Sequence, residues 1–274
     1  MSGTGQALTP TEAQVLLEPN SIPPQKALRT ALMHLAGAGH LRLLDGPPRP
    51  WWWGGSRKRV RRAARNSPLP GHLSAVMAAL FPPSKPDEPL SPEEMTTRLQ
   101  AAFGYSYGQF LSGHVLPELV SRGLLEVEEY RLLRLFPQRR YRHTAQGEAA
   151  RAWVQGALQP ARHLPELLRR DPAGAAAASA RLGGLVLIAD ELRPHLADLA
   201  AAARGNPTMP EMITMLDGVA EDERRIAWLD AVEILGEVDW GGVLEAVDGV
   251  GSAFDSADAG GSDGGGDGDG GGGE

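Results

Sequence analysis

Two runs of cationic side chains are the residues of this chain whose types and spacing could bind a ligand. In the first run, three tryptophans precede six cations that fall within nine residues: Trp51, Trp52, Trp53, Arg57, Lys58, Arg59, Arg61, Arg62 and Arg65. Near an anionic membrane each Lys or Arg contributes about 1 kcal/mol, and tryptophan favours the interface between headgroups and water. The run therefore predicts contact with an anionic lipid surface. Two alternatives are tryptophans folded onto the core beside solvated arginines, and cations that contact nucleic-acid phosphates.

The second run lies in a segment, residues 124–141, that reads as the two strands of a hairpin. Its candidate interaction residues are Arg131, Arg134, Phe136, Arg139, Arg140 and Arg142. We expect this hairpin to dock onto a protein partner or onto a second copy of the chain. The alternative is a tandem winged-helix protein that binds nucleic acid, because two helix–glycine–strand units are present and the hairpin would serve as a basic wing.

The sequence offers little for catalysis. Gly104–Gly108 matches G-x-S-x-G with Ser106 as the nucleophile, but that motif needs a strand before the serine, and a capped helix is predicted there instead. Histidine–carboxylate pairs at helical spacing, such as His114 with Glu118, offer two ligands where a catalytic zinc uses three. We therefore expect no catalytic residue, no metal and no cofactor.

Charge is divided unevenly along the chain. Residues 1–170 carry 22 Lys or Arg against 13 Asp or Glu, whereas residues 171–274 carry 5 against 21. An extended positive surface concentrates anionic partners around it, so we expect an acidic partner for the first part. Docking of one half of the chain on the other is the alternative.

Cysteine usage and hydropathy bear on location. The chain has no cysteine, which excludes disulfides and thiolate metal sites and fits a reducing cytoplasm. Its longest uncharged apolar run, residues 182–189, is far shorter than a membrane span. We therefore expect a cytoplasmic protein whose contact with a membrane is peripheral.

Helix signals dominate as far as residue 205. Capping boxes begin helices at Thr9 and Ser91. The periodicity predicts further helices ending at Gly39, over 72–80, over 109–122 with a kink at Pro117, and over the Ala-rich residues 173–189 and 192–203. A helix capped by Thr144 groups Ala149, Trp153, Val154 and Ala157. Residues 41–44 predict a strand, and the Pro-, Gly- and Trp-rich segment that follows predicts a long loop or a twisted hairpin.

These signals predict a mostly α protein: a compact helical domain with a few short strands and a protruding β-hairpin. We expect a flexible N-terminus over residues 1–8, the helical domain over 9–205 and additional helices over 206–249. Residues 250–274 lack the apolar content that offsets ordering entropy, so a disordered, acidic, Gly-rich tail is predicted there.

Several segments resemble the Golgi phosphoprotein 3 family. They are LPELVSRGLLEVEEYRLLRLFPQRRY from Leu116, the helix through Trp153, the Ala-rich RLGGLVLIADELRPHLADL, and ALRTALMHLAGAGHLRL, which is similar to the family's first core helix and strand. The likeness covers residues 8–205, and the Ala-, Gly- and Arg-rich composition is typical of a bacterial member. The resemblance implies a helical domain with a protruding hairpin that binds phosphatidylinositol 4-phosphate at membranes as a sorting adaptor, without catalysis.

The chain departs from that family where its members grip the lipid headgroup with a Trp and several Arg side chains. At the start of the first core helix it has residues 23–25, Pro-Pro-Gln, with Lys26 and Arg29 as the nearest cations. Before the helix that leads to the hairpin, residues 105–112 contain no Arg. The run from Arg57 to Arg65 does lie where the family has a basic strand. The resemblance therefore implies anionic membrane lipids as partners more firmly than it implies one headgroup.

Overall fold

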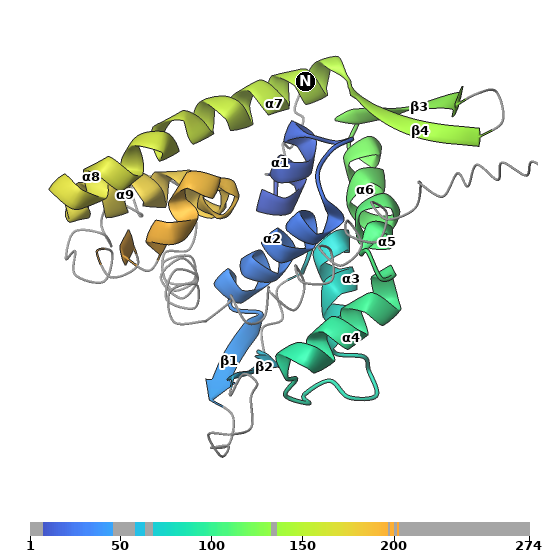
Figure 1. Ribbon diagram of the computed structural model, residues 1–274, viewed down its shortest axis with the longest axis horizontal. Helices are drawn as coiled ribbons and strands as arrows, with labels where there is room; N and C mark the ends of the chain where they lie inside the picture. Colours follow the sequence, from blue (N-terminus) through green and yellow to red (C-terminus); the bar gives the residue numbers. More distant parts are fainter. Residues whose placement is uncertain are drawn as a thin grey trace, which may run out of the picture.

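The computed structural model describes residues 8–45, 58–63, 68–132, 136–196, 198, 199 and 202. These residues are mostly α-helical and include two small antiparallel sheets of two strands each (Figure 1). The predicted fold class is confirmed. The expectations for the extreme N-terminus and for residues 206–274 lie outside the described residues. No helix among the described residues is long and apolar enough to cross a membrane.

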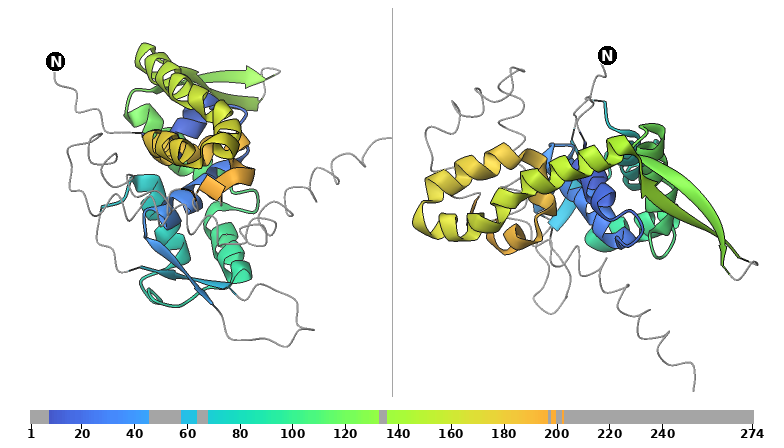
Figure 2. Two further views of the ribbon diagram at one scale, coloured as in Figure 1. Left: turned by 90° about the vertical axis from the view of Figure 1, so that its left-hand side faces the viewer. Right: turned by 90° about the horizontal axis from the view of Figure 1, so that it is seen from above.

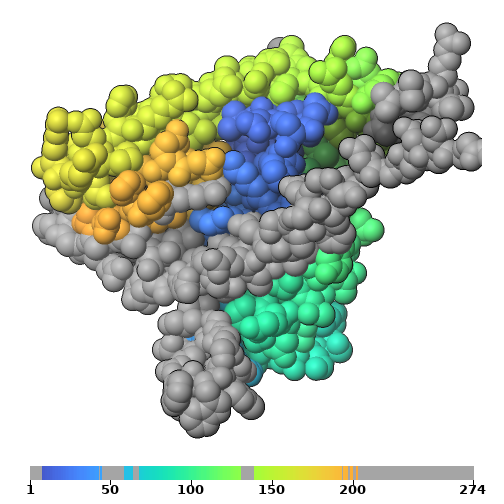
Figure 3. Space-filling view, viewed as in Figure 1, coloured from blue at the N-terminus to red at the C-terminus, as the bar shows by residue number. Residues whose placement is uncertain are grey.

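Helix α1 (Pro10–Leu17) lies at the centre of the molecule, between α2 (Pro24–Gly37) and α7 (Ala145–Leu158) (Figure 3). It begins at the predicted capping box: the Glu12 N–H donates to the Thr9 hydroxyl, and the Thr9 N–H donates to the Glu12 carboxylate. Every residue from Pro10 to Leu16 is buried. A helix that is buried all round is a core element, so α1 organises the packing of its neighbours.

After α2 two strands pair, and the second of them belongs to the segment predicted to be a long loop or a twisted hairpin, most of which lies outside the described residues. Gly39, with φ 70°, ends α2 in the left-handed region that favours glycine. Strand β1 (Leu41–Asp45) then pairs antiparallel with β2 (Lys58–Arg62). On its other edge, β2 exchanges two backbone hydrogen bonds of 2.8 Å between Val60 and Leu90. The tryptophans between the two strands lie outside the described residues.

Helices α3 (Gly71–Leu80), α4 (Pro92–Phe103), α5 (Gly108–Phe110) and α6 (Leu116–Ser121) cover one side of α2. The capping box at Ser91 is confirmed. The predicted irregularity near Pro117 takes the form of a π-helical turn over Leu111–Val115. Because proline has no N–H to donate, a regular α pattern loses a hydrogen bond there, and the chain inserts the wider turn just before it.

The predicted β-hairpin is confirmed as β3 (Leu125–Leu132) paired with β4 (Phe136–His143). It projects beyond the helical body, while α7 runs across the top of the molecule (Figures 1 and 2). Thr144 caps α7 by accepting a hydrogen bond of 3.0 Å from the Gly147 N–H. The predicted grouping on α7 splits between two faces, because Val154 is buried whereas the Trp153 side chain is 62% exposed.

After α7 the chain forms a 3₁₀ turn (Gln159–His163), α8 (Leu164–Arg170) and α9 (Pro172–Leu182). The prediction of one α-helix over 173–189 is wrong beyond Leu182. Gly183, with φ 53°, breaks the α pattern, and a 3₁₀ helix (Gly183–Ile188) follows. A second 3₁₀ helix (Asp190–His195) occupies the start of the other helix predicted here, with Pro194 inside it.

Candidate anion-binding surfaces

The β1–β2 sheet has an apolar face and a basic face. Leu41 and Val60 are buried against the core. Side chains alternate across a strand, so Arg42, Arg59 and Arg61 point away from the core, whereas Arg62, opposite Leu41 at the end of β2, lies on the other side of the sheet. We give the name β1–β2 basic face to all four arginines: Arg42, Arg61 and Arg62 are exposed and Arg59 is half-buried.

Like charges lie opposite each other across this sheet. Arg42 is paired in register with Arg61, and a pair of this kind destabilises a sheet. No ion pair joins any of the four arginines to another residue within the described ranges. This positive charge is therefore not offset by an ion pair within those ranges. The other members of the first predicted run lie outside the described residues: Trp51–Trp53, Arg57, Arg65 and the side chain of Lys58.

The β3–β4 hairpin is also rich in arginine, but three of its arginines lie opposite glutamates. In its register, Glu126, Glu128 and Glu129 lie opposite Arg142, Arg140 and Arg139. Arg142 Nε lies 2.8 Å from Glu128 Oε2, and Arg139 Nε lies 3.4 Å from Glu129 Oε1. The hairpin exposes Val127 at 42% and Tyr130 at 44%. Of the remaining predicted residues here, Arg134 and the side chains of Arg131 and Phe136 are not described.

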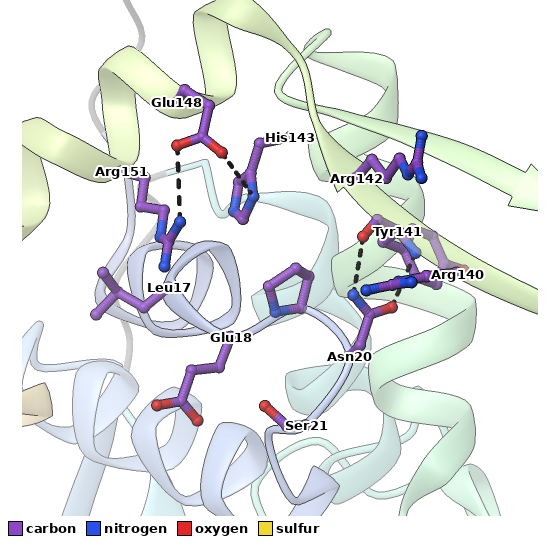
Figure 4. Close-up of a pocket in the computed structure, with 11 residues that line it drawn as sticks. Leu17, Glu18, Asn20, Ser21, Arg140, Tyr141, Arg142, His143, Glu148 and Arg151 are labelled. Atoms are coloured by element: carbon purple, nitrogen blue, oxygen red, sulfur yellow. Dashed lines mark hydrogen bonds and ion pairs between the residues drawn. The ribbon is translucent and has the colours of Figure 1, made fainter.

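A pocket of about 510 Å³ lies where the connection between α1 and α2 meets β4 and α7 (Figure 4). Asn20 closes one side by bonding the backbone of β4: its amide nitrogen donates to the Tyr141 carbonyl and its oxygen accepts from the Tyr141 N–H, both at 2.8 Å. His143 Nε2 lies 2.6 Å from the Leu16 carbonyl. A carbonyl only accepts, so Nε2 carries the hydrogen. These contacts clamp the base of the hairpin to α1.

Acidic residues offset the cations around this pocket. Glu148 lies 3.4 Å from His143 Nδ1 and 3.6 Å from the Arg151 guanidinium (Figure 4). Arg142 is paired with Glu128. Arg140 is exposed at the rim. Because most of its positive charge is paired, the pocket favours an anionic ligand less than the β1–β2 basic face does.

The family model described as Golgi phosphoprotein 3 (GPP34) matches residues 11–225. The chain belongs to the Golgi phosphoprotein 3 family. The match begins in α1 and includes both hairpins and all the helices that follow. Comparisons with curated proteins and with solved structures give no significant match.

The Golgi phosphoprotein 3 resemblance implies a lipid headgroup at the start of α2. In this chain the cation at that place already has an ion-pair partner. Lys26, in the first turn of α2, lies 2.9 Å from Asp190 Oδ2. This ion pair ties α2 to the second 3₁₀ helix after α9, Asp190–His195. Arg29 lies one turn further along α2 and is half-buried. The structure brings neither residue together with the β1–β2 basic face in one cluster.

A buried polar network that the sequence did not reveal joins α1, α3 and α6. His72, which is fully buried, donates from Nδ1 to Glu118 Oε2 at 2.6 Å and lies 3.2 Å through Nε2 from the Thr9 hydroxyl. Burial alone would raise the pKa of the Glu118 carboxyl. Hydrogen bonds from the His72 side chain and from the backbone of Gly71 and His72 outweigh it and hold that pKa below its usual value.

The same network brings together the ligand set of a metal site. Candidate ligand atoms of Glu12, His72 and Glu118 lie within 4.8 Å of one another. Each residue nevertheless has a partner inside the protein, and the Arg122 guanidinium lies 2.5 Å from Glu12 Oε1. A cation would compete with that guanidinium, so the arrangement fits a structural network. The sequence predicted only the capping-box role of Glu12. Its ion pair with Arg122 could not be predicted, because Arg122 is 110 residues away in the chain.

Ser106, the candidate nucleophile, is exposed in the turn between α4 and α5. A helix precedes it, and Gly104, with φ 80°, ends that helix. Within the described part of the chain, no hydrogen bond joins the Ser106 hydroxyl to a histidine. The strand–turn–helix context of a hydrolase nucleophile is therefore missing at this position.

Proposed function

We propose that the protein is a peripheral membrane-binding protein of the adaptor type, which attaches to anionic lipid through its β1–β2 end and performs no catalysis. The observation that carries the proposal is the β1–β2 basic face, four arginines with no ion pair among the described residues. Membership of the Golgi phosphoprotein 3 family supports it, because that family is associated with phosphoinositide binding. We assign the lipid contact to this face together with Trp51–Trp53, Arg57, Lys58 and Arg65.

The two hairpins lie at opposite ends of the molecule in the front and side views (Figures 1 and 2). A flat membrane that contacts the β1–β2 end therefore leaves the β3–β4 hairpin on the far side of the molecule. That hairpin combines three Glu–Arg cross-strand pairs with exposed Val127 and Tyr130. Such a surface suits a protein partner or a second copy of the chain better than it suits phosphate.

Flotation of the full-length protein with vesicles tests the lipid contact. We expect binding to vesicles of phosphatidylcholine mixed with phosphatidylglycerol, none to phosphatidylcholine alone, and weaker binding as salt is raised. The triple variant Arg59→Ser, Arg61→Ser, Arg62→Ser should bind roughly 100-fold more weakly, since each cation contributes about 1 kcal/mol. Unchanged binding would contradict the proposal.

The matched control removes the same charge from the other hairpin. Arg139→Ser, Arg140→Ser, Arg142→Ser should leave vesicle binding within about twofold, because these side chains face glutamates at the far end of the molecule. Equal losses in the two variants would show that only net charge matters.

Nucleic acid is the second candidate partner. The chain does contain two units of a helix followed by an antiparallel hairpin, α2 with β1–β2 and α6 with β3–β4. Retention on duplex DNA together with no binding to any vesicle would favour the winged-helix alternative over the membrane proposal.

A further inference from the structure

The C-terminal segment of the chain has the opposite charge to the β1–β2 basic face. Residues 226–274 carry twelve Asp or Glu and no Lys or Arg. They lie beyond the family match, which ends at residue 225. They therefore form an acidic extension of a domain whose basic face lacks ion pairs within the described ranges.

We propose that residues 226–274 dock on the β1–β2 basic face of the same chain and compete there with anionic lipid. The competition rests on the proposed function, whereas the docking does not. Docked carboxylates would screen the repulsion between Arg42 and Arg61. The segment and lipid headgroups would then bind the same arginines, so that each weakens the binding of the other.

The other described cations are less suited to this segment, because most already have partners. Lys26 is paired with Asp190, Arg122 with Glu12, and Arg98 with Glu88. The arginines of β4 face glutamates of β3. Among the described cations, the β1–β2 basic face is the cluster whose positive charge is not yet offset. Electrostatic complementarity therefore selects this face.

The chain is long enough for the contact. Residue 226 follows the last described residue, Ala202, by 24 residues, which span up to about 80 Å. A compact domain of this size has a radius of gyration of about 16 Å. Being tethered, the acidic segment is present at an effective concentration on the order of millimolar, so weak individual contacts suffice.

Proximity can be measured with one label, because the protein has no cysteine. We would attach a nitroxide to Ser262→Cys in the full-length protein and record the amide signals of both hairpins. Broadening is expected at Arg59–Arg62 and not at Glu126–Glu129. It should be lost at about 0.5 M salt, where charges are screened beyond a few ångströms. No broadening, equal broadening of the two hairpins, or broadening that disappears on dilution would overturn docking within one chain.

Competition is tested by neutralising the segment in the full-length protein. The variant changes six carboxylates to amides: Asp255→Asn, Asp258→Asn, Asp263→Asn, Asp267→Asn, Asp269→Asn and Glu274→Gln. Its affinity for phosphatidylglycerol-containing vesicles should rise about three- to tenfold. The matched control neutralises six exposed carboxylates of the domain: Glu18, Asp87, Glu126, Glu166, Glu191 and Asp198. An equal rise in the control, or no rise in the variant, would overturn the competition.

The two measurements separate this inference from the proposed function. Broadening at the β1–β2 basic face without any vesicle binding would establish the docking and contradict the membrane proposal. Vesicle binding that is the same for the parent and the neutralised chain, with no broadening, would support the membrane proposal and refute the docking.

Discussion

The β1–β2 and β3–β4 hairpins are both rich in arginine, but they differ in the residues that lie opposite those arginines on the neighbouring strand. In β3–β4, three glutamates of one strand lie opposite three arginines of the other. In β1–β2, Arg42 lies opposite Arg61, and Leu44 lies opposite Arg59. The number of cations in a hairpin therefore does not by itself identify an anion-binding surface. The register decides, because it determines which cations have a partner inside the protein.

The hairpins also differ in what holds their bases. At the base of β3–β4, the Asn20 amide bonds the Tyr141 backbone twice, His143 bonds the Leu16 carbonyl, and the Thr144 hydroxyl donates to the Gly123 carbonyl at 2.6 Å. The base of β1–β2 is held by backbone hydrogen bonds, from the Ala63 N–H to the His40 carbonyl and between Val60 and Leu90. Substitutions that remove these contacts therefore test whether the two hairpins are held by different interactions.

The largest expected effect comes from Gly147→Ala, at the junction of the β3–β4 hairpin and α7. A Cβ at this position would lie 1.9 Å from the Leu124 carbonyl oxygen, so the backbone must shift. We expect the free energy of unfolding in urea to fall by about 3 kcal/mol. Gly156→Ala on the same helix is the control, because nothing lies within 4 Å of the Cβ that alanine would add there. It should stabilise the protein by about 0.5–1 kcal/mol, and equal effects of the two changes would contradict the close approach at Gly147.

Acidic pH is expected to destabilise the other hairpin region, where α2 leads into β1. Burial, with smaller effects from His72 and His40, lowers the pKa of His34 to about 4. This value is below the usual 6.5, so the unfolded chain binds the proton first. The contribution of neutral His34 to the free energy of unfolding is fully present above pH 6.5 and is lost as the pH falls toward 4. Because His34 is not fully buried, we expect a loss of at most about 2 kcal/mol between pH 7 and pH 5, measured by urea unfolding.

The control for this pH dependence is His34→Gln, which cannot be protonated. Nδ1 of His34 is buried without a hydrogen-bond partner, so the replacement removes no hydrogen bond at that atom. The variant should lose clearly less stability than the parent between pH 7 and pH 5. A loss as large as that of the parent would assign the acid sensitivity to other groups.

A smaller effect is expected from Asn20→Ala, which removes both hydrogen bonds to the Tyr141 backbone. The free energy of unfolding should fall by about 1–2 kcal/mol, and amide exchange should accelerate in β4 while it stays unchanged in β2. Asn20→Asp is the informative second variant, because it keeps the acceptor and loses the donor. A uniform acceleration across both hairpins would show that Asn20 supports the whole fold and does not act on one hairpin alone.

Local signals made much of the fold predictable. Capping boxes at Thr9 and Ser91 and glycines at 39 and 123 mark helix ends through contacts within a few residues, and the structure has them where the sequence placed them. The β3–β4 hairpin was predictable for the same reason. The two 3₁₀ helices over residues 183–195 were not, because an α and a 3₁₀ helix bury similar apolar residues and differ only in a small backbone preference.

The candidate sites were predictable only as runs of residue types. The sequence supplied both groups of arginines, but the difference between them depends on pairing in register and on contacts between distant residues. Asn20 and Tyr141 are 121 residues apart, and Lys26 and Asp190 are 164 apart. No periodicity within the chain encodes such contacts. Trp153 was likewise grouped with buried Val154, although one position further along a helix is enough to change the face.

The smallest predicted effect tests the register argument itself. Arg61→Glu places a carboxylate opposite Arg42 and converts a repulsive cross-strand pair into an attractive one. The free energy of unfolding should rise by about 0.5–1 kcal/mol, while binding to anionic vesicles weakens. Glu129→Arg makes the reverse change in the other hairpin, opposite Arg139, and should destabilise the protein by a similar amount without loss of vesicle binding. Stability shifts of the same sign in the two variants would contradict the assignment of β1–β2 as the hairpin whose charge is left for an outside partner, because they would show that opposite side chains do not sense each other.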